Sequence, residues 1–251
     1  MEWDRPWYAG WALAGQAVQA RWTGGAPLHG ALQSQGASPV RFVPQSALPD
    51  GMAYEQFVFN TRNCPVREGL HDFFNGLVWM RFPQAKLRLN ALQAAEIAVR
   101  GTSGARGPVR DAITVFDENG ALLDAHAPLW DALFARQWRK LFVDLRPLWE
   151  HARLVVFGHA LLEQLVSPRK GLTAHVWRSQ CAINSGSNVD GWLAAQLTAD
   201  ALGAKPFTPL PVLGIPGWWS ENRNFSFYDD SLVFRPPRRQ NHTTTEQPAG
   251  P

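Results

Sequence analysis

The chain has 251 residues, of which 45% are hydrophobic and 18% are charged, with a formal net charge of +3. This composition suffices for one sizeable core and excludes intrinsic disorder for most of the chain. The mild charge carries no nucleic-acid signature, and no apolar run approaches the roughly 18 residues of a membrane span. Two cysteines cannot form a disulfide framework, so we expect a cytoplasmic protein. We also expect no signal peptide.

The N-terminal quarter is predicted to hold one helix, a long loop and a strand. Trp3, Trp7 and Trp11 recur every four residues, which predicts a helix over the first fifteen residues. This aromatic stripe favours a clamp onto the core over a partner-binding surface. Residues 23–52 are rich in Gly, Pro, Ser and Gln and indicate a loop. The stretch YEQFVFN at 54–60 is predicted to be a strand.

The middle of the chain alternates between helical and strand-like patterns. Two helices are expected over 68–81 and 84–99, followed by a basic, glycine-rich loop over 100–110. The segment 112–123 is predicted to be a β-hairpin, because its Asn-Gly pair is typical of a hairpin turn. Further elements are expected as a helix over 127–138, strands over 140–145 and 153–158, a helix over 159–166, a strand over 172–178 and a helix over 189–202.

The C-terminal part turns proline-rich from Lys205 and is predicted to form an extended belt on the surface. The polar tail at 236–251 is predicted to be disordered. Interleaved helices and short strands, without a regular strand–helix alternation, indicate an α+β fold. We therefore expect a single domain over 1–235, in which short mixed or antiparallel strands pack with helices.

Polar side chains follow one edge of the first central helix. At about 100° per residue, His71, Asp72, Asn75 and Trp79 fall within about 100° of one another, and apolar residues occupy nearly all the rest. A helix that is apolar on most sides is buried. A buried polar group without a partner costs roughly 1–3 kcal/mol, so this edge is expected to face hydrogen-bond partners, a metal or a water-filled cleft.

A second polar edge is expected where a helix follows directly on a strand. His159 and Glu163 are four residues apart and share a face of that helix. Asp117 and Glu118 are further candidates at the predicted hairpin turn, and His175 alternates with apolar residues on a strand. We predict that the two histidine-bearing helices turn their polar edges toward one cavity.

Three interpretations of these polar residues remain open. The first is a zinc, manganese or iron site, since imidazole and carboxylate groups are the ligands that these metals take. Its tentative ligands are His71, Asp72, His159, Glu163 and His175. The second is a metal-free cleft for acid–base chemistry, and the third is a purely structural network.

The leading functional hypothesis is a hydrolase-like enzyme, metal-assisted or not, that acts on a small-molecule or acidic substrate. Its catalytic residues are expected among His71, Asp72, His159, Glu163, Asp117 and Arg110. The arginine would hold an anion, and the histidines would act as bases or ligands. The rival is a non-catalytic binding or scaffold protein. Neither cysteine lies in a recognisable catalytic motif, and the oligomeric state is not readable from the sequence.

Four ordered motifs carry a resemblance to a known family. LHDFFNGLVWMRFPQAKLRLN, RDAITVFDENGALL, VVFGHALLEQLVSPRKGLTAH and LPVLGIPGWW with FYDDSLVFRP span about residues 54–236. Together they resemble a proteobacterial family of uncharacterised proteins, domain of unknown function 3025. The resemblance implies one domain and a bacterial cytoplasmic setting. The family has no established activity that could be transferred to this chain. Its motif positions here are His71, Asp72, Asn75, Lys86, Asn90, Arg110, Asp111, Asp117, Glu118, His159, Glu163 and His175.

Overall fold

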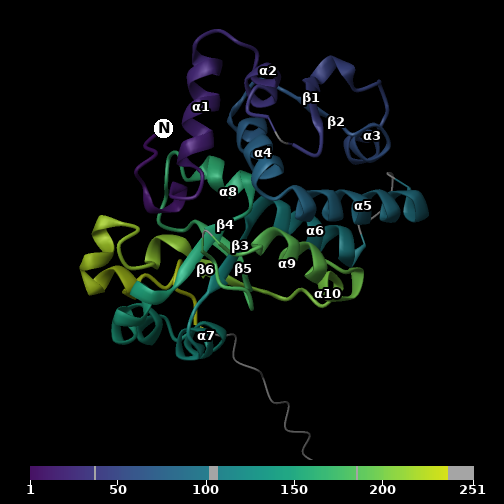
Figure 1. Cartoon of the computed structure of the whole chain (residues 1–251). Helices are drawn as coiled ribbons and strands as arrows, with labels where there is room; N and C mark the ends of the chain where they lie inside the picture. Colours follow the sequence, from purple (N-terminus) through teal and green to yellow (C-terminus); the bar gives the residue numbers. More distant parts are fainter. Residues whose placement is uncertain (37, 102–106, 185, 237–251) are drawn as a thin grey trace, which may run out of the picture.

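The computed structural model describes residues 1–36, 38–101, 107–184 and 186–236 (Figure 1). Its helices are α1 (Ala12–Thr23), α2 (Leu28–Gln33), α3 (Tyr54–Thr61), α4 (Leu70–Arg81), α5 (Pro83–Arg100), α6 (Pro108–Asn119), α7 (Ala127–Phe134), α8 (His159–Gln164), α9 (Val189–Gln196) and α10 (Ala199–Gly203). Its strands are β1 (Arg41–Pro44), β2 (Asn63–Val66), β3 (Gly120–Asp124), β4 (Arg153–Val156), β5 (Thr173–Arg178) and β6 (Phe207–Pro211). Short turns of 3₁₀ helix link several of them.

Two small sheets lie among the helices. The larger has the order β4-β3-β5-β6 and is mixed, since β3 runs antiparallel to β4 and parallel to β5, while β5 and β6 are antiparallel. The smaller is a parallel pair of β1 and β2. Its location beside α2 and α3 separates it from the larger sheet (Figure 1). The expected α+β class with short mixed strands is therefore confirmed.

One continuous hydrophobic core extends from Trp7 to Phe234. The first four residues of β3 are buried, so both faces of this central strand are covered. Helix α6 packs against β3 and β5, and α8 packs against α4, α6 and β4. Trp7 and Trp11 are buried in the core, as the clamp interpretation of the aromatic stripe requires. Among the described residues, no helix combines the length and apolar character needed to cross a membrane.

Several element predictions are wrong in the N-terminal quarter. The first fifteen residues hold a short turn at Pro6–Tyr8, and the helix proper begins only at Ala12. The predicted loop at 23–52 contains α2 and β1. The predicted strand at 54–60 is α3, whose buried Phe57 and Val58 point into the core from a helical face.

Three further predictions are wrong in the second half. The predicted hairpin at 112–123 is the end of α6 followed by β3, because Ala112, Ile113 and Phe116 bury a helical face. Asn119-Gly120 is therefore a helix-to-strand junction. The predicted strand at 140–145 is a turn of π-helix, and the helix expected over 189–202 is split into α9 and α10.

The proline-rich segment is only partly a surface belt. Its residues Phe207–Pro211 form β6, which lies at the edge of the larger sheet, where a strand tolerates proline. Leu210, Val212 and Leu213 are fully buried. Of the predicted disordered tail, all residues beyond 236 lie outside the described part of the chain, as do residues 102–106 of the predicted basic loop.

Gly158 fixes the position of the helix that follows it. A β-carbon at this residue would lie 2.4 Å from the carbonyl oxygen of Glu118 and 2.5 Å from the amide nitrogen of Asn119. The Gly158 amide also donates to the carbonyl of Gly120 at 2.8 Å. The absence of a side chain therefore lets the start of α8 lie directly against the end of α6.

We predict that Gly158→Ala destabilises the protein by about 1–3 kcal/mol, because the methyl group must push two backbone segments apart. Chemical unfolding of the purified variant measures this loss. Gly171→Ala is the matched control, since its β-carbon would have only one neighbour, at 3.9 Å. Equal stabilities for the two variants would contradict the close approach.

Candidate functional site

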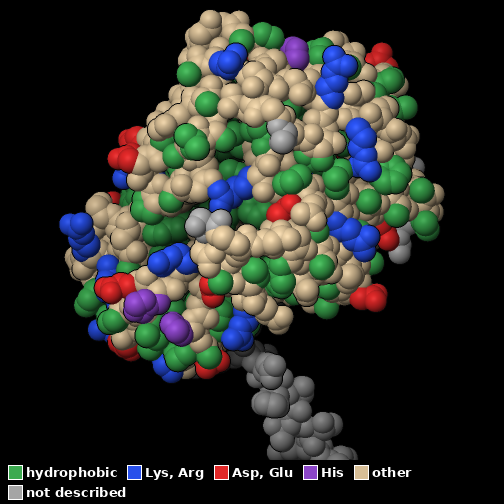
Figure 2. Space-filling model, viewed as in Figure 1, with side chains coloured by type: hydrophobic (Ala, Val, Ile, Leu, Met, Phe, Trp, Pro, Cys, Tyr) green, Lys and Arg blue, Asp and Glu red, His purple; other side chains and the backbone are tan. Residues whose placement is uncertain are grey.

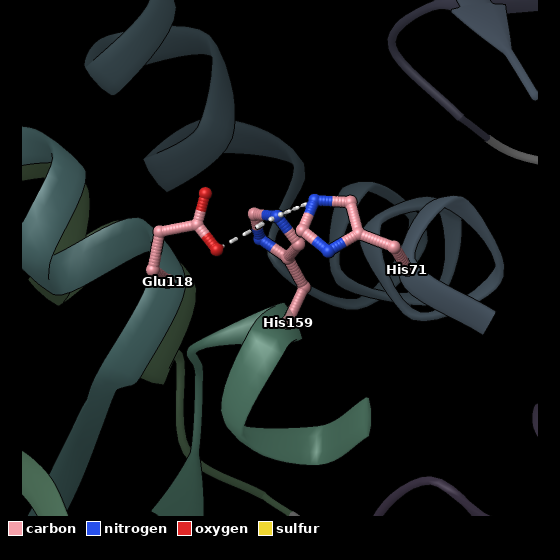
Figure 3. A group of neighbouring side chains, drawn as sticks. All are labelled: His71, Glu118 and His159. Carbon is pink, nitrogen blue, oxygen red and sulfur yellow. Dashed lines mark hydrogen bonds and ion pairs between the residues drawn. The ribbon is translucent and has the colours of Figure 1, made fainter. Parts of the chain in front are cut away.

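Three side chains from distant parts of the chain converge at one point (Figure 3). His71 lies in the first turn of α4, Glu118 at the end of α6, and His159 is the first residue of α8. Contacts of α8 with both α4 and α6 bring them together. Each contributes one potential ligand atom, and these atoms all lie within 4.8 Å of one another.

The two imidazoles approach each other through the same ring atom. Nε2 of His71 and Nε2 of His159 are 3.1 Å apart, and the rings meet at 76°. Oε2 of Glu118 lies 3.6 Å from Nε2 of His159. His159 is buried, whereas His71 and Glu118 are half-buried, so the cluster is reached from one side.

Carboxylates lie on the opposite edges of both rings. Nδ1 of His71 is 3.1 Å from Oε2 of Glu163, and Nδ1 of His159 is 3.7 Å from Oδ2 of Asp117. The Glu163 carboxylate accepts from Nδ1 of His71, which favours the His71 tautomer with its proton on Nδ1 and an acceptor at Nε2. Asp117 lies beyond hydrogen-bond distance of Nδ1 of His159, which has no hydrogen-bond partner among the described residues, so Nε2 of His159 is the donor to Nε2 of His71.

The electrostatic environment keeps His159 neutral. Burial lowers its pKa to about 4, and the nearby Lys86 also lowers it, which outweighs the opposite effect of Asp117. A neutral imidazole with a free Nε2 is the form that binds metals. Burial also raises the pKa of Glu118, and the neighbouring Asp117 carboxylate raises it further.

A buried ion pair lies next to the cluster. The Lys86 ammonium donates to both carboxylate oxygens of Asp117, at 2.6 and 2.9 Å, and to Oδ1 of Asn75 at 3.0 Å. Burial raises the pKa of Asp117, but Lys86 and the two imidazoles lower it more, so the net shift is downward. Asp117 is thus held as a carboxylate beside His159.

Two adjoining cavities open onto these residues. One, of about 170 Å³, is lined by His71, Glu118, His159 and all the polar residues of the α4 edge, including Asp72, Asn75 and Trp79. The other, of about 210 Å³, lies between α3, α4, α5 and α6. Trp79, Lys86 and Asp117 line both, so the two polar cavities are direct neighbours.

The structure brings some predicted site residues together and separates others. His71, His159, Glu163 and Asp117 form the cluster and its immediate surroundings. The Asp72 carboxylate lines the cavity but is engaged by Arg67, through its backbone amide at 2.6 Å and its guanidinium at 3.1 and 3.2 Å.

Arg110 and His175 do not line either cavity. The Arg110 guanidinium donates to the carbonyl of Gly101 at 3.3 Å. His175 lies on β5 opposite Gly120, with its ring edge-on to Phe207. Burial lowers the pKa of His175. Their predicted catalytic and ligand roles therefore find no support from proximity to the His71–His159 cluster.

Sequence reasoning missed the contribution of α3. Glu55 and Tyr54 line the 170 Å³ cavity from its first turn. A helical signal was present, since Tyr54, Phe57, Val58 and Thr61 follow an i, i+3, i+4, i+7 pattern. Glu118 was a candidate only as part of a hairpin turn, and its place at a helix end was not foreseen.

A further cavity, of about 580 Å³, lies away from this cluster. Trp7, Trp11 and Phe82 supply its apolar surface, and Arg81 and Arg153 its basic groups. In the view of Figure 2, the surface over the N-terminal segment and β4 is hollowed, with hydrophobic side chains inside and basic ones beside it. It contains none of the clustered histidines.

Comparison with known protein families places the cluster in a wider context. Residues 40–238 match the family described as protein of unknown function DUF3025. The chain belongs to this family. Neither a search of curated proteins nor one of solved structures gave a match. The DUF3025 match contains His71, Glu118 and His159, and the N-terminal segment with α1 precedes it.

The Cys64 thiol is poorly suited to act as a nucleophile. The side chain is buried in the DUF3025 region, and the Tyr54 hydroxyl lies 3.1 Å from its sulfur. Burial raises the pKa of the Cys64 thiol to about 12, although the Tyr54 hydrogen bond acts in the opposite direction. The thiolate is the reactive form, so Cys64 is expected to be inert at neutral pH.

We predict that iodoacetamide at pH 8 modifies the partly exposed Cys181 while Cys64 stays unmodified in the folded protein. Mass spectrometry of time points gives the two rates, and Cys181→Ser should resist alkylation until unfolded. Rapid modification of Cys64 in the native protein would show that its thiol is reactive and would contradict this prediction.

Proposed function

We propose that this protein is a metal-dependent hydrolase with a mononuclear centre formed by His71, Glu118 and His159. The observation that carries the proposal is the pair of facing Nε2 atoms, 3.1 Å apart, with a carboxylate oxygen 3.6 Å from one of them. In the free protein one ring donates to the other across this contact, and a shared cation would take the place of that proton.

The distances suit a small transition-metal ion. Imidazole nitrogen and carboxylate oxygen bind zinc at about 2.0–2.2 Å, so two donors on one ion lie at most about 4.2 Å apart. The His71–His159 and His159–Glu118 separations of 3.1 and 3.6 Å fall within that limit, and all three ligand atoms lie within 4.8 Å of one another. Glu163, hydrogen-bonded to Nδ1 of His71, corresponds to the outer carboxylates that orient metal-bound histidines, and Asp117 lies 3.7 Å from Nδ1 of His159.

A centre with three protein ligands leaves a position for water or substrate, as catalytic zinc sites do. When bound, the metal would lower the pKa of its water to about 7 and polarise a carbonyl or phosphoryl oxygen. Lys86, whose ammonium lines the same cavity, would stabilise negative charge that develops on the substrate. Asn75 and Asp117 hold that ammonium in place.

We predict that the purified protein binds one zinc or manganese ion per chain. His71→Ala, His159→Ala and Glu118→Gln should each abolish stoichiometric binding, because each removes a ligand. Glu163→Gln should weaken it about 10–100-fold through the loss of an orienting carboxylate. Metal analysis after dialysis, and titration of the metal-free protein, measure these effects.

His175→Ala is the matched control and should retain full metal content, since it removes a partly buried imidazole outside the cluster. Variants that stay folded yet keep their metal would contradict the ligand assignment. A protein that binds no metal, and whose His159→Ala variant merely unfolds earlier, would favour the scaffold function. Tight binding of iron(II) would instead favour oxygen chemistry, which a site of two histidines and one carboxylate also supports.

Catalysis is tested separately with chromogenic esters, amides and phosphodiesters. The metal-loaded protein should hydrolyse at least one class, and chelation or Glu118→Gln should reduce the rate by about 100-fold or more. Lys86→Met should lower kcat more than metal affinity, because Lys86 lines the cavity without being a ligand. Activity that survives removal of the metal would contradict the proposal.

A further inference from the structure

The 210 Å³ cavity beside the candidate metal centre has a polar lining. Side chains of four helices line it, among them Glu55 of α3, Trp79 of α4, Asn90 and Gln93 of α5, and Asp117 of α6. It shares Trp79, Lys86 and Glu118 with the cavity at the histidines. A ligand seated here therefore lies beside the candidate metal centre.

Negative groups outnumber positive ones in this cavity. Glu55, Asp117 and Glu118 line it, and Lys86 is the one basic side chain among its lining residues. The Lys86 ammonium is already committed to Asp117 and Asn75. Glu118 faces the histidines. Among the described residues, Glu55 has no ion pair of its own: burial raises its pKa, and the attraction to Lys86, which is bonded to Asp117, does not offset that effect.

Hydrogen-bond acceptors accumulate around Glu55. The Asn90 amide nitrogen donates to the Glu55 carboxylate at 2.6 Å and to its backbone carbonyl at 2.9 Å. These two bonds fix the orientation of the amide, which leaves Oδ1 of Asn90 as an acceptor. That oxygen has no partner, although Asn90 is only 2% exposed. Oε1 of Gln93, one helical turn further along α5, is also buried without a partner.

A buried acceptor without a donor is costly, so these oxygens call for a donor from water or from a ligand in the cavity. A ligand that replaces water here must donate hydrogen bonds to Asn90 and Gln93 and compensate the charge of Glu55. An ammonium group has three donors, no acceptor and one positive charge. A carboxylate or phosphate meets neither requirement.

We propose that this cavity binds the protonated primary amine of the substrate, through Glu55, Asn90 and Gln93. The assignment of that ligand as a substrate rests on the proposed hydrolase function, whereas the recognition of an amine does not. The substrate would then be a small molecule with an amino group. Its amino group would lie in this cavity, and its scissile bond would lie at the metal.

The test uses n-butylamine as the probe, with n-butyrate and n-butanol as analogues of equal chain length. Binding is followed by the indole N–H resonance of Trp79, which lines the cavity and is assigned with Trp79→Phe. The amine should shift this resonance saturably and bind at least tenfold more tightly than either analogue. The same preference should hold in the full-length His159→Ala protein, which lacks a metal ligand.

Glu55→Gln should weaken amine binding at least tenfold, and the exposed Glu221→Gln is the matched control that should leave it unchanged. Because Glu55→Gln could perturb α3, Gln93→Glu provides a second variant, which should tighten amine binding and weaken that of butyrate. Equal binding of amine and butanol, or an unchanged amine affinity in both cavity variants, overturns the inference. Neither result bears on metal content, so the two proposals fail independently.

Discussion

The close contact between the Nε2 atoms of His71 and His159 is the constraint on which the site depends. Each ring has a carboxylate on its other edge, Glu163 for one and Asp117 for the other. Glu163 accepts from Nδ1 of His71, so Nε2 of His71 is an acceptor that faces Nε2 of His159 at 3.1 Å. A cation that displaces the proton between the two rings would turn this hydrogen-bonded pair into a ligand set.

The end of α6 divides two tasks between adjacent residues. The Asp117 carboxylate accepts from Lys86 on α5, and the Glu118 carboxylate faces His159 on α8. A buried ion pair contributes little net stability, but removal of one partner leaves an unpaired charge that costs about 3–5 kcal/mol. The Lys86–Asp117 pair therefore ties α6 to α5 at the residue before Glu118. Gly158 completes the arrangement by admitting α8 against the same helix end.

The sequence was informative where periodicity and burial agree. His71, Asp72, Asn75 and Trp79 were assigned to one edge of a helix, and all four line one cavity. The pattern was unambiguous because α4 is long and apolar on its other sides. The prediction that two distant helices turn their polar edges together depended on tertiary packing, and the 3.1 Å contact confirms that they meet.

Short segments were misread because local propensity competed with packing. The stretch at 54–60 is rich in aromatic residues and reads as a strand, yet it forms α3 and supplies Glu55. Asn119-Gly120 is a strong hairpin signal, but burial of Ile113 and Phe116 imposes a helix before it. The ligand position of Glu118 follows from that helix, so it could not emerge from a hairpin prediction.

The protonation of the two histidines tests the account most directly. Long-range ¹H–¹⁵N correlation spectra of the metal-free protein report which ring nitrogen carries the proton, with His71→Ala and His159→Ala providing the assignments. We predict a proton on Nδ1 of His71 in the metal-free protein, and coordination shifts of both Nε2 resonances when zinc is added. A proton on Nε2 of His159, bonded to His71 and unmoved by zinc, would contradict the metal centre.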